Sequence, residues 1–249
     1  MNGSLLLVPA GLLAGGMNAL AGGGSFVTLP ALIASGIPSV SANATSSVAL
    51  YPGGAVSAWV YRDGLGPVCG IPLVPTLVIT LVGGLAGSLL LLWTPNSLFD
   101  RVLPWLLLPT TLALMFGPRA GAVLRARLTV GRPTILAVQF LLGVYGGYFG
   151  GAVGLMMMAA WSLLQGADIK ALNAPRTLMV TAANAVAIFC FAVAGVVRWE
   201  AALLVGAGAV AGGYAGAHLG RRLNPTLVRG ATLLISTAIT ARFFMRAYS

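Results

Sequence analysis

The composition of this 249-residue chain excludes an ordinary soluble protein. Hydrophobic residues make up 58% of the chain and charged residues only 7%, where a soluble domain carries about 25% charged residues. The mean hydropathy is +0.96. The formal net charge is +10, but the basic residues interrupt the hydrophobic runs instead of lining one face, so we expect no nucleic-acid partner.

Long runs without charge predict an all-α polytopic membrane protein. They cover Met1–Tyr61, Gly64–Phe99, Pro133–Ala167 and Thr177–Val197. A helix needs about 20 apolar residues to cross a bilayer, and these runs lack the alternation of a membrane β-barrel. No basic region of a signal peptide precedes the first run, so we expect it to begin the mature protein. The expected location is the cell (inner) membrane, with several crossings.

The first half of the chain is expected to contain four membrane segments. A glycine-interrupted stretch at about 4–35 would be roughly 48 Å long as one helix, too long for a bilayer core of about 30 Å. We therefore expect a broken or re-entrant segment. A helix with a polar start follows at about 41–61, and two apolar helices follow at about 69–93 and 97–118.

A basic loop at 119–132 joins this half to a second half that has the same order of elements. The loop contains four arginines and no acid, which predicts a cytoplasmic position. The second half is expected to form four elements, at about 134–165, 171–197, 200–220 and 225–246.

Matching residues of the two halves lie 129 positions apart, as Gly22 and Gly151, Gly83 and Gly212, and Leu98 and Leu227 do. The sequence therefore predicts two homologous transmembrane repeats, 1–118 and 133–249, as in many secondary transporters. If the first segment of each half is re-entrant, each half has an odd number of full crossings and the repeats are inverted. If it is not re-entrant, the repeats are parallel, with eight crossings. Both arrangements remain open from the sequence.

The glycine breaks are the first candidates for substrate binding. A helix that restarts inside a membrane protein presents free N–H groups and a positive partial charge, which favour an anion. The alternative is that these glycines only let helices pack closely. The candidate residues are Gly22, Gly23, Gly24 and Ser25 in the first half, and Gly150 and Gly151 in the second.

Polar helix starts supply the second set of candidates, Asn43, Thr45, Ser46, Asn173 and Thr177. Their hydroxyls and amides could replace the hydration shell of an oxyanion, or could serve as helix caps and interhelical hydrogen bonds.

Arg176 is the cation directly before the charge-free run Thr177–Val197. The 129-residue shift aligns it with Ser47. A guanidinium at membrane depth is costly and usually functional, and it matches the oxygens of a sulfonate, sulfite or carboxylate. The alternative is an interfacial arginine paired with Asp168. Asn184, two turns further along, is expected to form interhelical hydrogen bonds.

No catalytic centre, metal site or cofactor is expected. The four acidic residues lie at segment ends, so a carboxylate proton relay has no obvious carrier. The two cysteines, Cys69 and Cys190, match no metal or redox spacing. His218 is expected to be structural or interfacial. The tryptophans near segment ends are expected to be interface anchors.

The chain resembles the sulfite exporter TauE/SafE family of membrane permeases over nearly its full length. The resemblance implies transport of a small anion, often a sulfur oxyanion or an organosulfonate. The motifs that carry it are Gly22-Gly23-Gly24-Ser25-Phe26, Leu29-Pro30-Ala31-Leu32, Ser35-Gly36-Ile37-Pro38, Ala42-Asn43-Ala44-Thr45-Ser46, Asn173-Ala174-Pro175-Arg176-Thr177, Asn184 and Gly195-Val196-Val197-Arg198-Trp199.

Three functions are compared. The first is a secondary transporter for a small anion that works by alternating access between the repeats. The second is a passive anion channel on the same scaffold. The third is an intramembrane serine protease that uses Ser25 and His218, against which Phe26 follows the serine where glycine would be expected. The partners expected are the anion and the lipid bilayer; the coupling ion and a homodimer are left open.

Overall fold

The computed structural model describes residues 6–21, 23–125, 131–151, 153–165, 169–220 and 225–248, and in this part of the chain it is all helical, without a named strand. One short 3-10 turn, η2 (Arg62–Gly64), is present. The α-helices are α1 (Leu7–Ala21), α2 (Ser25–Ala34), α3 (Ser39–Val60), α4 (Leu73–Trp93), α5 (Asn96–Arg125), α6 (Arg132–Phe149), α7 (Val153–Gln165), α8 (Ile169–Val193), α9 (Trp199–Gly220) and α10 (Pro225–Tyr248).

The ends of the helices follow from local sequence chemistry. Pro38 precedes α3, and the side-chain oxygen of Asn96 accepts a hydrogen bond from the Val40 N–H at 3.0 Å, which satisfies one free donor of the first turn. After the C-terminal end of α8, Gly195 has a φ of +67°, and the Val196 N–H donates to the Phe191 carbonyl at 3.3 Å. A left-handed glycine after the last turn is a common helix stop.

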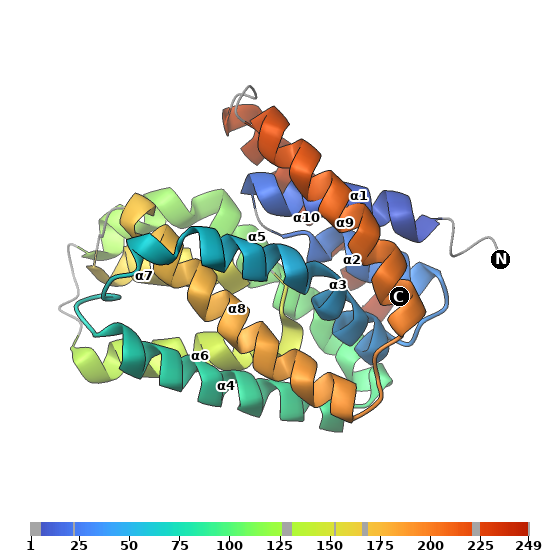
Figure 1. Ribbon diagram of the computed structural model, residues 1–249, viewed down its shortest axis with the longest axis horizontal. Helices are drawn as coiled ribbons and strands as arrows, with labels where there is room; N and C mark the ends of the chain where they lie inside the picture. Colours follow the sequence, from blue (N-terminus) through green and yellow to red (C-terminus); the bar gives the residue numbers. More distant parts are fainter. Residues whose placement is uncertain are drawn as a thin grey trace.

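Two pairs of helices distant in the sequence pack most closely. α1 lies along α9, and α6 lies along α4, as Figure 1 shows near the two ends of the molecule. Glycines allow these close approaches: a side chain at Gly212 would meet the Leu12 carbonyl, and one at Gly147 would meet the Gly84 carbonyl. Such contacts between small residues are typical of helices in membranes.

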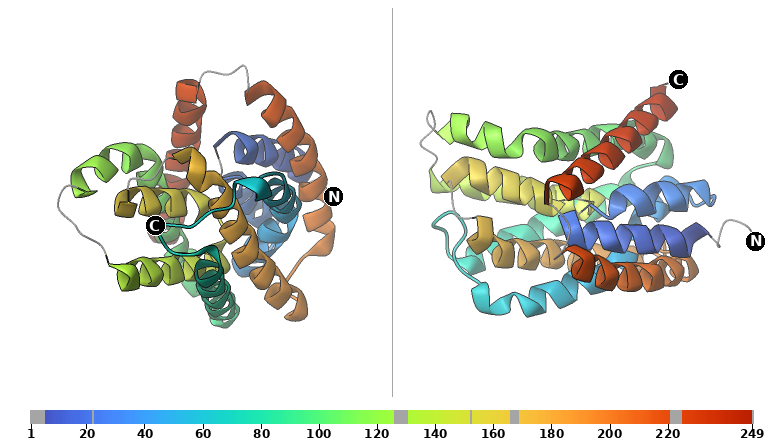
Figure 2. Two further views of the ribbon diagram at one scale, coloured as in Figure 1. Left: turned by 60° about the vertical axis from the view of Figure 1, so that its left-hand side comes forward. Right: turned by 90° about the horizontal axis from the view of Figure 1, so that it is seen from above.

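The remaining helices complete a bundle in which most run along one direction, with α10 oblique to the others (Figure 2). α3 packs against α8 and α9, and α5 packs against α7 and α10. Several polar side chains inside the bundle bond to one another. Gln139 donates to the Thr80 hydroxyl at 2.7 Å and accepts from the Trp161 indole at 2.9 Å. This network joins α4, α6 and α7 at depth, where an unpaired group would be costly.

The outer surface is strongly apolar, as a lipid-facing surface requires. Large hydrophobic side chains such as Trp93, Leu203 and Leu234 are more than 70% exposed. Among the described residues, two helices are long and apolar enough to cross a membrane by length and composition, Leu73–Trp93 and Leu172–Val193.

The boundaries predicted from sequence match the helices to within a few residues, with one clear difference. α5 continues to Arg125, so the first part of the predicted basic loop is helical. The residues there include alanine, leucine and arginine, which are good helix formers. Residues 126–130 of the predicted loop lie outside the described part of the chain.

Candidate functional site

A cavity of about 450 Å³ lies between helices of both halves of the chain. It is bounded by the end of α1, the starts of α2 and α7, and one side each of α3 and α8. The sequence candidates that line it are Gly23, Ser25, Gly150, Asn173, Arg176 and Thr177. The site therefore combines one cation with hydroxyl, amide and backbone groups.

The first glycine stretch interrupts the helix as the sequence predicts. α1 ends at Ala21, α2 begins at Ser25, and Gly23 between them has a φ of +96°, a conformation that residues with a side chain rarely adopt. The Gly24 carbonyl accepts the Val27 N–H at 3.0 Å, and Gly24 itself is buried against α1, outside the cavity wall. Gly22 lies outside the described residues.

The second glycine stretch interrupts the chain between α6 and α7, where Gly150 has a φ of +69°. Gly151 is buried, and a side-chain carbon added to it would lie 3.0 Å from the Ser25 Cβ. The two interruptions therefore meet each other. Their contact brings the first residues of α2 and α7 to one cavity. At the start of α2 the Phe26 N–H donates to the Gly23 carbonyl, and the Thr28 N–H donates to that of Gly24.

Arg176 extends from α8 beside the start of α7. Its Cδ lies 3.6 Å from the position that a Cβ on Gly154 would occupy, so the arginine stem packs against this part of α7. Asn173 and Thr177 lie on the same wall, and the Thr177 hydroxyl donates to the Asn173 carbonyl at 2.7 Å. The oxygen of Thr177 keeps its lone pairs and the Asn173 amide stays available to a ligand.

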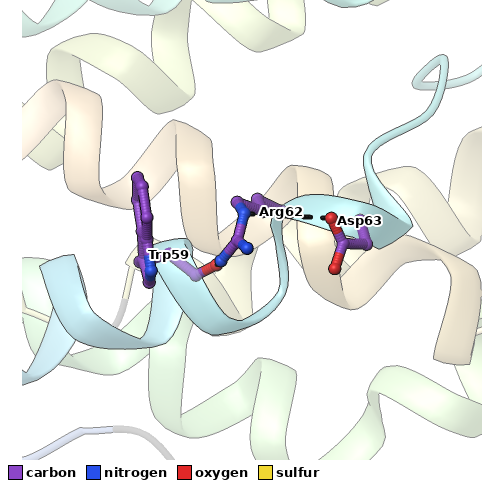
Figure 3. Close-up of polar contacts among 3 residues, drawn as sticks. All are labelled: Trp59, Arg62 and Asp63. Atoms are coloured by element: carbon purple, nitrogen blue, oxygen red, sulfur yellow. Dashed lines mark hydrogen bonds and ion pairs between the residues drawn. The ribbon is translucent and has the colours of Figure 1, made fainter.

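Among the described residues the one ion pair lies elsewhere, between Arg62 Nε and Asp63 Oδ1 at 3.8 Å. Figure 3 shows the Arg62 guanidinium between Asp63 and the Trp59 ring, whose centroid is 4.4 Å from Arg62 Cζ. Both charged side chains are well exposed, so this pair contributes little stability. No described acidic side chain lines the cavity beside Arg176. The alternative partner, Asp168, lies outside the described residues.

Three of the polar candidates on α3 face away from the cavity and bond to the protein. The Asn43 amide donates to the Tyr148 carbonyl at 3.0 Å, and the Thr45 hydroxyl oxygen accepts the Arg198 N–H at 3.0 Å. The Ser46 hydroxyl bonds to that of Thr28. All three side chains are buried. Their contacts match the capping and interhelical alternative, and the Asn43 bond fixes the end of α6 beside the second break.

The cavity also contains polar residues that sequence reasoning did not select, including Asn18, Ser47, Tyr51, Thr181 and Asn184. The Thr181 hydroxyl donates to the Gly54 carbonyl at 3.1 Å and thereby joins α8 to α3. Asn184 does not form the expected interhelical bond: its Oδ1 is buried and has no hydrogen-bond partner. Two signals could have identified Ser47 and Asn184, namely the alignment of Ser47 with Arg176 and the two-turn spacing from Arg176 to Asn184.

His218 is exposed on α9 and lies outside the cavity wall that contains Ser25. Its Nδ1 lies 3.0 Å from the Tyr214 carbonyl of its own helix. The described residues contain no group of three or more His, Cys, Asp or Glu side chains that could hold a metal ion. The arrangement therefore offers binding groups for an anion, and it brings no base to Ser25.

Comparison with known proteins agrees with this geometry. The family profile described as sulfite exporter TauE/SafE matches residues 7–243. A probable membrane transporter protein, YfcA of Escherichia coli K12, is 28% identical over 235 residues, which cover 93% of this chain and 86% of that protein. A probable membrane transporter protein of Haemophilus influenzae is 29% identical over 237 residues, covering 95% and 92%. No solved structure matches the chain significantly.

The profile covers nearly the whole chain, and the relatives align with it from end to end. The relatives carry the names of membrane transporters. This chain is a membrane transporter and no enzyme, and it belongs to the sulfite exporter TauE/SafE family.

Proposed function

We propose that this protein is a multi-pass secondary transporter of the cell (inner) membrane. Its substrate would be a small anion, a sulfur oxyanion or an organosulfonate of sulfite-like size. Transport would proceed by alternating access between two repeats around the cavity described above.

The single observation that carries the proposal is the shared cavity of Arg176 and the two helix interruptions. A guanidinium offers paired N–H donors that match the oxygens of a sulfur oxyanion. The N-termini of α2 and α7 add the positive partial charge of a helix start. No aspartate, glutamate or histidine is among the described lining residues, so no carboxylate there repels an anion.

The arrangement of helices supports two repeats. The Thr111 and Thr240 hydroxyls, 129 positions apart, bond to each other at 3.2 Å. This is the shift that relates the halves in sequence, and equivalent residues meet where a two-fold axis passes between repeats. The α1–α9 and α6–α4 pairs correspond under the same shift. A cavity between such repeats is where transporters of duplicated architecture bind substrate.

The outer surface supports several crossings. Trp59, Trp93 and Trp199 are more than half exposed and lie near helix ends, where aromatic side chains prefer the membrane interface. The arginines between the halves would hold that connection in the cytoplasm.

Anion flux in proteoliposomes tests the proposal. Purified full-length protein is reconstituted, and uptake of radiolabelled sulfite is compared with that of short-chain organosulfonates and of an uncharged sulfone. A carrier predicts saturable uptake and counterflow, in which unlabelled internal substrate speeds entry of label. Uptake that stays linear with concentration and shows no counterflow would indicate a channel, and vesicles no more permeable than empty liposomes would reject anion transport.

A further inference from the structure

A second polar subsite lies at the end of α6, apart from Arg176. A Cβ placed on Gly150 would lie 2.8 Å from the Ser47 hydroxyl oxygen, 3.1 Å from Asn184 Oδ1 and 3.6 Å from the Gly146 carbonyl oxygen. Three oxygens from three helices thus surround the side of Gly150 that has no side chain. Gly150, Ser47 and Asn184 all line the cavity.

The two side-chain oxygens of this subsite are both acceptors. The Ser47 hydroxyl donates its proton to the Asn43 carbonyl at 3.1 Å, so its oxygen presents lone pairs to the subsite. Asn184 Oδ1 is buried without any hydrogen-bond partner. A buried acceptor without a partner is destabilising, and it is rare in native proteins unless a ligand or water satisfies it.

The backbone beside Gly150 also presents a hydrogen-bond acceptor, the Gly146 carbonyl oxygen. Gly146 lies in the last turn of α6, where the helix carries the negative partial charge of its C-terminus. A subsite made of acceptors at the negative end of a helix repels an anion and favours a cation. Broken helices in transporters use their C-terminal carbonyls in this way for a coupling ion.

The charge of Arg176 does not prevent cation binding. Asn184 follows Arg176 by eight residues on α8, so their Cα atoms are about 12 Å apart along the helix axis. An anion bound between them would be attracted from both ends. The described lining residues include no Asp, Glu or His side chain that could carry a proton instead.

We propose that Ser47, Asn184 and the Gly146 carbonyl bind a monovalent cation of the size of Na⁺. This inference rests on the proposed anion transport in one respect: the cation would enter with the anion and couple its movement to the sodium gradient. The oxygens are neutral, which suits a singly charged alkali ion.

The test measures binding of ²²Na⁺ to the purified full-length protein without any anionic substrate beyond chloride. The wild-type protein is expected to bind Na⁺ saturably. Asn184→Ala should weaken binding about tenfold or more, which is the effect of one lost contact to a charged group. Asn96→Ala is the matched control, because Asn96 is an exposed asparagine at the start of α5 outside the cavity wall, and its loss should leave Na⁺ affinity per folded protein unchanged.

Asn184→Asp keeps an oxygen at the same position and should retain or tighten Na⁺ binding, which guards against a folding defect in the alanine variant. No saturable Na⁺ binding by the wild-type protein, or equal affinity in wild type and Asn184→Ala, would overturn the cation site.

The two proposals fail separately. Sulfite flux that is identical in sodium and choline media, without Na⁺ binding, removes the cation site and leaves anion transport intact. Na⁺ binding that depends on Asn184, in a protein that carries no anion, supports the cation site and rejects the transport proposal.

Discussion

Gly150 combines a left-handed backbone conformation with close contacts to the proposed cation ligands. Its φ is +69°, and the space beside its Cα is bordered by the oxygens of Ser47 and Asn184. Any side chain here would strain the backbone and also fill the subsite.

Gly150→Ala is therefore expected to reduce both stability and transport. The strain alone costs on the order of 1–3 kcal/mol. Gly195→Ala is the control, since Gly195 has nearly the same φ of +67° but no atom within 4 Å of an added Cβ. Both variants should melt at a lower temperature in detergent, and only Gly150→Ala should lower anion flux per folded protein. Equal flux in the two variants would mean that the subsite has no part in transport.

Cys69 illustrates how burial controls a reactive group outside the spanning helices. It lies in the turn closed by the Val68–Ile71 bridge, is 4% exposed, and has the pKa of its thiol raised by burial to about 11 from an ordinary value of 9.0. At pH 8 the thiolate fraction of Cys69 should therefore be about 100-fold below that of a free thiol.

A Cys190→Ala background leaves Cys69 as the one thiol of the chain, and its reaction with a maleimide can be followed against pH. The rate in the folded protein should be low at pH 8 and rise towards pH 11. Because the folded state favours the neutral thiol, this group stabilises the fold below about pH 9 and loses that contribution as pH rises towards 11. Rapid labelling at pH 8 without denaturant would contradict the buried position.

The polar helix starts show what the sequence can and cannot specify about a site. Arg176, Asn173 and Thr177 line the cavity, as their residue types and position suggest. Asn43, Thr45 and Ser46 have the same chemistry but face the bundle interior. A polar run at a helix start covers every side of the helix. Which of these side chains face the cavity depends on the helices packed against the others, here α6 and α2. For this reason residue type alone did not separate Ser47 from Ser46, and only the alignment of Ser47 with Arg176 favoured it.

At the scale of helices, the charge-free apolar runs and the glycine positions were sufficient to place most boundaries. The predicted helix at 97–118 begins one residue from α5, and that at 225–246 begins with α10. The pairing of helices could not be predicted, because α1 lies against α9 and α6 against α4 through glycines that are spread along apolar runs. Many glycine pairs fit such a pattern, and the three-dimensional packing selects among them.

The α4–α6 contact gives a prediction about packing. A Cβ at Gly147 would overlap the Gly84 carbonyl, so Gly147→Ala should destabilise the protein by about 1–3 kcal/mol, the usual effect of overpacking. Gly230→Ala on α10 is the control, because an added Cβ there meets nothing within 4 Å and alanine favours a helix by about 1 kcal/mol.

Thermal unfolding in detergent checks both alanine variants. Gly147→Ala should melt below the wild-type protein and Gly230→Ala at or above it. A wild-type melting temperature for Gly147→Ala would show that α4 and α6 can separate without loss of stability.

For the whole molecule, the described structure concentrates its polarity at one place. The outer surface is apolar, most polar core side chains bond to other protein groups, and the cavity holds Arg176 with the two helix interruptions. Family membership makes the protein a membrane transporter. The proposed division of the cavity, with the anion at Arg176 and the cation at Asn184, would place both ions between the halves that have to move.

The most direct measurement is sulfite flux into proteoliposomes for wild type, Arg176→Gln and Arg101→Gln. Arg101 is an exposed arginine on α5 outside the cavity wall, so its variant controls for the loss of one positive charge. If Arg176 binds the anion, Arg176→Gln should lower flux at least about tenfold, the effect of one lost charge-assisted contact, while Arg101→Gln matches wild type. Undiminished flux in Arg176→Gln, at equal amounts of reconstituted protein, would contradict the assignment of the anion site to this cavity.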